Sequence, residues 1–197
     1  MSATSSPYGL IPQSDMTGTP RTLCLPAGIA SGLASNIFKY QPVKLDIVHG
    51  TITPITATTD QIYGVFAGVE YTPTGGRPTV SPFWPASATW DSTLMMNAYI
   101  WPAWLPGLRF VLQADGTVAQ ALYGSGFNFS NFSAGSTTTG QSQITAAHAG
   151  VAASSQAQVA LVEFYTGLSS TVGDLYTDLI VSIAYPQVVS GYQVSVG

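Results

Sequence analysis

The sequence predicts an all-β fold: an antiparallel β-barrel or sandwich core with long loops and extended terminal arms. Runs of β-branched and aromatic residues each end at a cluster of glycine or proline, which is typical of strand, turn and strand. Gly75-Gly76 and Asp115-Gly116 supply tight turns between such runs. Glycines and small residues surround residues 29–38, which argues against a long helix there.

We expect residues 62–71 to form the strand around which the core is built. Successive side chains of a strand point to opposite faces, so Val65 lies on one face and Phe66 on the other. Apolar groups on both faces predict a strand that is buried on both sides, as in the wall of a barrel or sandwich. Gly64 and Gly68 share a face and leave room for a bend or for another segment to approach closely.

The other predicted strands divide the chain into an arm, one domain and a tail. They are expected at residues 22–25, within 42–55, and at 79–84, 108–113, 118–123, 158–165 and 176–185. We therefore predict an N-terminal extended arm over residues 1–20, a single β-rich domain over 21–186, and a C-terminal tail or short strand over 187–197. Within the domain, residues 124–155 are expected to form a long uncharged loop, because no Asp, Glu, Lys or Arg occurs from Gly116 through Val162.

Charged residues make up only 7% of the chain, against roughly a quarter of an average protein. A free monomer normally stays soluble through a charged surface of mixed sign. Two interpretations follow: a robust extracellular β module with a Ser/Thr surface, or a subunit that works inside an assembly. We favour the assembly.

The charge pattern also argues against some partners. The net charge is -4 and the five basic residues are scattered, so no nucleic-acid partner is expected. No apolar run approaches the roughly 18 residues that span a bilayer, so no membrane partner is expected either. The N-terminal residues 1–7 lack the basic and apolar regions of a signal peptide, which predicts synthesis in the cytoplasm without export by that route.

The sequence predicts a protein that is not an enzyme, with no catalytic residues, metal site or cofactor. Glu70 and Glu163 lie in apolar strands, but a solvated or salt-bridged role is favoured over a glycosidase pair. His49 and His148 are too far apart in sequence for a zinc signature, and Cys24 is expected to be a small buried residue. A Ser/His/Asp triad stays open because serines are abundant, although no Gly-x-Ser-x-Gly elbow occurs.

Eight apolar side chains are candidates for contact with another chain. They are Tyr8, Leu10 and Ile11 in the arm, Trp101 and Trp104 in a rigid aromatic loop, and Phe127, Phe129 and Phe132 in the uncharged segment. The four tryptophans all lie between Trp84 and Trp104, and three roles are open to them: core, interface or a stacking platform for carbohydrate.

Several short phrases of the chain resemble head structural proteins of podovirus-like tailed bacteriophages, of the decoration or cement kind. The phrases are residues 29–38, 41–45, IYGVFAGVEY at 62–71, 83–85, FVLQADG at 110–116 and STTTG at 136–140. The resemblance runs in scattered pieces from about residue 29 to 139 and leaves both ends uncovered, and residues 101–107 match none of it. It implies an all-β subunit without catalytic residues, bound to the outside of an icosahedral head.

We therefore expect a cement subunit that is made in the host cytoplasm and resides on the outer capsid surface of the virion. Its expected partners are the major capsid protein and further copies of itself, as a trimer, with a dimer as the alternative. A carbohydrate-binding or host-attachment module is the second hypothesis, and a tail or connector subunit is the third. Buried indole rings would favour the cement protein, whereas coplanar exposed rings beside polar groups would favour the carbohydrate-binding module.

Overall fold

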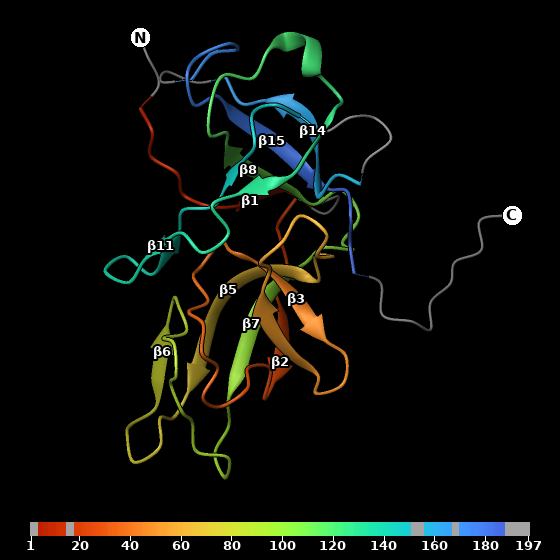
Figure 1. The fold of residues 1–197 in the computed structure, drawn as a ribbon. Helices are drawn as coiled ribbons and strands as arrows, with labels where there is room; N and C mark the ends of the chain where they lie inside the picture. Colours follow the sequence, from red (N-terminus) through yellow and green to blue (C-terminus); the bar gives the residue numbers. More distant parts are fainter. Residues whose placement is uncertain (1–3, 15–17, 151–155, 167–169, 188–197) are drawn as a thin grey trace, which may run out of the picture.

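The computed structural model describes residues 4–14, 18–150, 156–166 and 170–187. Its regular structure is almost entirely β strand, and every ladder between neighbouring strands of its sheets is antiparallel. The strands form two main sheets in two lobes, one above the other in Figure 1. Neither sheet closes on itself within the described residues. The all-β prediction is confirmed, and of the two expected architectures the structure has the open, sandwich-like one.

The upper lobe is built on a five-stranded sheet whose order is β1-β8-β15-β14-β9 (Figure 1). Its strands are β1 (Ile11–Ser14), β8 (Arg109–Gln113), β15 (Asp178–Ile183), β14 (Val159–Phe164) and β9 (Gly126–Phe127). One face of this sheet packs on a first core that includes Phe110, Leu112, Leu179 and Val181. Leu179 and Val181, which share one face of the strand expected at residues 176–185, are fully buried.

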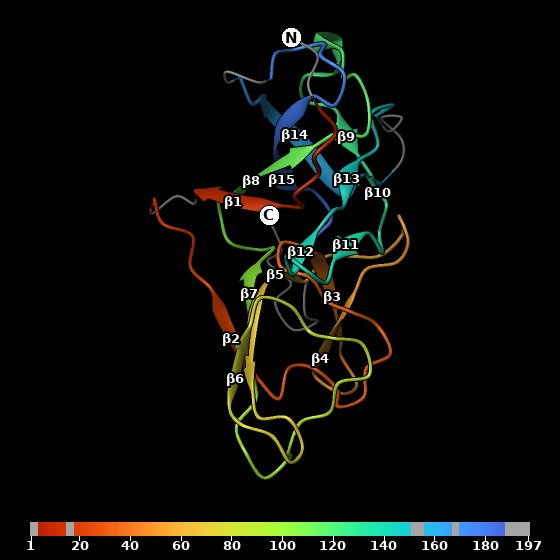
Figure 2. The ribbon, with the colours of Figure 1, turned by 90° about the vertical axis from the view of Figure 1, so that its left-hand side faces the viewer.

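The lower lobe is built on a six-stranded sheet that wraps around a second core. The sheet order is β2-β7-β5-β3-β4, and β6 pairs with the opposite end of β5 from β3. Figure 2 shows the curl of the sheet from the side. The bounds are β2 (Leu23–Pro26), β7 (Asn97–Pro102), β5 (Gly64–Tyr71), β3 (Pro42–Asp46), β4 (Thr51–Pro54) and β6 (Thr79–Ser81). The Ile52 N–H donates to the Gly28 carbonyl at 2.7 Å, which brings the edge strand β4 beside the residues that follow β2. That single bond does not extend into a ladder among the described residues.

Strand β5 joins the two cores, as expected for the strand at residues 62–71. Val65 is fully buried in the first core and Phe66 is fully buried in the second. Gly64 lets the neighbouring strand approach, because a Cβ there would lie 2.7 Å from the Trp101 carbonyl oxygen. Gly68 has a φ of 151° beside the register shift between β5 and β7, so it forms the bend that its sequence position predicted.

The N-terminal segment is part of the fold rather than a free arm, which corrects the prediction for residues 4–14. Leu10 is fully buried in the first core, and Ile11 begins β1, which pairs with β8. The Tyr8 hydroxyl donates to Asp178 Oδ1 at 2.9 Å. Burial raises the pKa of Tyr8 and the nearby Asp178 adds to the shift, so the phenol stays protonated as a donor. The apolar cluster of the segment therefore docks on the chain itself.

The uncharged segment is also folded, which corrects the expected loop. It contains β9, β10 (Phe129–Ser130), β11 (Gly135–Ser136), β12 (Gln141–Ser142) and β13 (Thr145–Ala146), while residues 151–155 lie outside the described part. Neutral side chains link β10 to β13: the hydroxyls of Ser130 and Thr145 are 2.8 Å apart. Just before this segment, the strand expected at residues 118–123 is instead a 3-10 turn, η1 (Gln120–Leu122).

The described part of the chain ends beside β3. The Leu45 N–H donates to Gln187 Oε1 at 2.7 Å, and Gln187 Nε2 donates to the Leu45 carbonyl at 2.9 Å. The side-chain amide of Gln187 therefore pairs with the strand edge as a backbone would. The rest of the predicted tail, residues 188–197, lies outside the described part of the chain.

Candidate functional site

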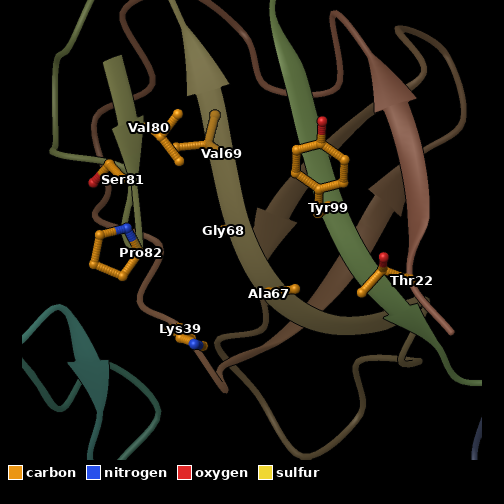
Figure 3. A pocket seen from close by; sticks show the side chains of 9 residues that line it. All are labelled: Thr22, Lys39, Ala67, Gly68, Val69, Val80, Ser81, Pro82 and Tyr99. Carbon is orange, nitrogen blue, oxygen red and sulfur yellow. The ribbon is translucent and has the colours of Figure 1, made fainter. Parts of the chain in front are cut away.

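A groove of about 400 Å³ crosses the outer face of the six-stranded sheet (Figure 3). The bend at Gly68 forms its floor, with Val80, Ser81 and Pro82 of the β6 segment on one side and Tyr99 and Thr22 on the other. Lys39 lies at one end and is the one charged residue of the lining.

Two of the polar side chains around this groove, Ser81 and Tyr99, already have hydrogen-bond partners within the chain. The Ser81 hydroxyl donates to the Phe83 carbonyl at 2.6 Å. The Tyr99 hydroxyl donates to Glu70 Oε2 at 3.2 Å, and this hydrogen bond raises the pKa of Tyr99. The groove therefore presents mostly apolar walls and few free hydrogen-bonding groups. It suits apolar contact better than the positioning of a reacting substrate.

The four tryptophans do not form a platform. Trp84 is fully buried in the second core, and the Trp90 indole N–H donates to the Ile29 carbonyl at 3.1 Å. The Trp101 ring stacks on Tyr40, with 5.7 Å between ring centroids and 16° between planes, and the Lys39 ammonium lies 5.0 Å from the centre of the Tyr40 ring. Trp104 is 44% exposed and tilted against Tyr63. No two indoles stack on each other among the described residues.

The eight candidates for contact with another chain differ in how deeply their side chains are buried. Leu10, Phe127 and Phe129 are core residues with at most 2% exposure, so the prediction that they contact another chain is wrong. Their side chains pack inside the first core. Of the other five candidates, Trp104 is exposed. The remaining four are partly buried: Tyr8, Ile11, Trp101 and Phe132.

Other large apolar side chains are exposed that were not predicted as contact residues from the sequence. In the upper lobe they are Tyr123, Tyr165, Val172 and Leu175, which we call the upper-end patch; in lower-lobe loops they are Ile47, Val48, Leu94 and Met95. Figure 1 shows η1 and the connection from β14 to β15 at the top of the upper lobe. The sequence contains a signal for the lower-lobe residues. Ile47 with Val48, and Leu94 with Met95, are pairs of adjacent apolar residues next to a turn or a polar loop.

Few charges of the upper lobe are left for a partner. Between residues 108 and 187 the charged residues are Arg109, Asp115, Glu163, Asp174 and Asp178. Three of the four carboxylates accept hydrogen bonds from within the chain: Asp115 from Ser130, Asp174 from the Thr171 N–H, and Asp178 from Tyr8. Contact with a partner at this end would therefore involve mainly neutral groups.

One serine, one histidine and one aspartate do meet, but not in the order of a catalytic triad. His148 Nδ1 lies 2.7 Å from Asp115 Oδ1, and the Ser130 hydroxyl donates to Asp115 Oδ2 at 2.8 Å. In a triad the serine would bond to the histidine ring, which would take its proton. Here the carboxylate accepts from both neighbours. Burial alone would raise the pKa of Asp115, but hydrogen bonds from the His148 N–H, the His148 ring and Ser130 outweigh burial and lower it.

We expect Asp115→Asn to lower the free energy of unfolding by about 1–2 kcal/mol at neutral pH. The folded-state pKa lies below the ordinary value, so this stabilisation is complete above the unfolded pKa of about 4 and is lost as the pH falls through the folded pKa. Urea unfolding across the acid range measures the difference, with the exposed Glu163→Gln as the control. A difference that stays constant down to the lowest pH at which both proteins fold would contradict the role of the ionised carboxylate.

The remaining chemical candidates lie apart. Glu70 is exposed on β5 of the lower sheet and Glu163 is exposed on β14 of the upper sheet, so they are not a carboxylate pair. In the described ranges, no group of three or more His, Cys, Asp or Glu residues is placed to hold a metal ion. The same residues include no helix with the length and apolarity needed to cross a membrane.

In comparisons with known proteins, no family model, no curated protein and no solved structure matches the chain.

Proposed function

We propose that this chain is a non-enzymatic structural subunit of a tailed-bacteriophage head, a decoration or cement protein that binds the outer surface of the shell. The observation that carries the proposal is the upper-end patch: four large apolar side chains are exposed on a lobe whose carboxylates mostly bond inside the chain. Large apolar side chains that are exposed where few charges are free are typical of a surface that another protein covers.

The proposed partner of the upper-end patch is the major capsid protein. Burying a Leu or Val side chain contributes about 1.5–3 kcal/mol, and larger aromatic rings bury more area. Several such side chains can offset much of the cost of association, and the binding free energy then adds to the stability of the shell. This is the physical basis on which a cement protein resists the pressure of packaged DNA.

We propose further that copies of the chain associate with one another as a trimer, with a dimer as the alternative. Free strand edges support self-association. β2 ends the path of the lower sheet and β9 ends the path of the upper one, so each has one edge without a partner strand among the described residues. Such edges readily pair with a second chain.

The two rival functions receive less support. Carbohydrate binding through a tryptophan platform needs coplanar exposed rings, and Trp84 is buried while Trp90 and Trp101 are anchored to other groups. A tail or connector subunit would use the same kind of surface. Its place on the particle distinguishes it from a head protein.

The test is binding of the purified protein to phage heads that lack it. We expect cosedimentation to persist in about 1 M salt, where the Debye length is only about 3 Å, because apolar burial is not screened. Val172→Glu combined with Leu175→Glu should weaken binding by at least about tenfold, since each change leaves a carboxylate in an apolar contact. Thr74→Glu, at an exposed turn of the lower lobe, is the matched control. Release of the wild type by moderate salt from intact shells would contradict the proposal.

A further inference from the structure

A second cavity, of about 550 Å³, lies where the two lobes meet. We call it the lobe-junction pocket. Its base contains Phe38, Gln41 and Ile55, which are buried. Phe132 is half-buried in its wall, and the hydroxyl side chains of its rim are exposed: Ser35, Thr56 and Ser133. Segments of both lobes line it, since residues 34–41 precede β3 and residues 132–133 connect β10 to β11 (Figure 2).

The walls of the pocket are held in place before any ligand arrives. The Phe38 N–H donates to Gln41 Oε1, and Gln41 Nε2 donates to the Phe132 carbonyl, each at 2.9 Å. One buried amide therefore ties the two walls together. Phe38 also packs over Gly135 so closely that a Cβ there would lie 2.2 Å from the ring. A pre-organised site loses less conformational entropy on binding.

The lining excludes two classes of ligand. It contains no charged residue, so an ionic group inside it would lose hydration without gaining a counter-charge. A wholly apolar ligand would cover Ser35, Ser133 and Asn36 without pairing them. Asn36 accepts from the Ala86 N–H through Oδ1, and neither its amide nitrogen nor the hydroxyls of Ser35 and Ser133 donate to another described residue.

What remains is a ligand that is neutral, rich in hydroxyl groups and apolar on one face. We propose that the lobe-junction pocket binds a neutral saccharide unit, with the sugar face against Phe132 and its hydroxyls bonded to Ser35, Asn36 and Ser133. The volume lies within the range of about 300–1,000 Å³ that is usual for ligand pockets. This inference goes beyond the proposed function, because it stands on the pocket alone and holds whether or not the chain binds a phage head.

The test is an NMR titration of the isotope-labelled full chain. The neutral probes are methyl α-D-glucopyranoside, methyl β-D-galactopyranoside and N-acetylglucosamine, at up to about 50 mM, and glucuronate is the charged comparison. At least one neutral probe should shift the amide signals of residues 35, 36, 132 and 133 in a saturable way. Glucuronate should bind at least about tenfold more weakly.

Two variants locate the site. Ser133→Val removes a rim hydroxyl and Phe132→Ala removes the stacking face, and each should weaken binding by about tenfold. Thr74→Val removes an exposed hydroxyl that is not part of the pocket lining and should bind like the wild type. Phe132 also packs against the first core, so Phe132→Ala could disturb folding. If that variant does not fold, the result for Ser133→Val alone tests the site. Absence of shifts with all three neutral probes, equal binding of glucuronate, or undiminished binding by Ser133→Val would overturn the proposal.

Discussion

Val65→Asp is expected to abolish folding of the whole chain. Val65 is fully buried, and it contributes to the first core from a strand that belongs to the lower sheet. An unpaired carboxylate at this position costs several kcal/mol, which is comparable with the whole stability of a typical domain at about 5–15 kcal/mol. Circular dichroism and thermal melting measure the outcome.

The matched control carries the same substitution on the neighbouring strand. Val80 lies on β6 and is 81% exposed, so Val80→Asp should change the unfolding free energy by less than about 0.5 kcal/mol. Solubility and a cooperative melt for Val65→Asp would show that β5 does not join the two cores.

Removal of residues 1–14 is the second large effect that we expect. The deletion takes away β1, the Leu10 side chain and the bond from Tyr8 to Asp178, and it leaves the edge of β8 without its partner strand. We expect the truncated chain to lose its cooperative melting transition and to aggregate through that edge.

A point substitution tests the same packing in graded form. Leu10→Ala should cost about 2–5 kcal/mol, as for other fully buried leucines. Leu94→Ala, at a leucine that is 49% exposed, should cost less than about 0.5 kcal/mol. If the truncated chain melts like the full one and Leu10→Ala matches Leu94→Ala, the N-terminal segment is a dispensable arm.

The sequence predicted strands well where the strand pattern is local. β5 has apolar residues on both faces, and the strand ends at a turn that residues 75 and 76 supply. The N-terminal segment was misjudged because its partner, β8, lies about a hundred residues away, and no local period marks a four-residue edge strand. The uncharged segment was misjudged because its two-residue strands are held by neutral side chains, such as Ser130 and Thr145, that usually favour turns.

Contact residues were harder to predict than strands. Phe127 and Phe129 sit among serines and asparagines, and nothing in their neighbourhood shows that β14 and the rest of the first core enclose them. The exposed apolar residues of the upper-end patch lie in connections between strands, where Val172 and Leu175 resemble ordinary turn neighbours. Burial of a single side chain depends on packing between distant segments, which a local pattern does not encode.

The most direct test of the proposed function is an electron-microscopic reconstruction of a phage particle that carries this chain. We expect density for the two-lobed fold on the outer surface of the head, with the upper-end patch against the major capsid protein and copies grouped in threes. Density for this chain only in the tail or connector, or only on the inner side of the shell, would contradict the account.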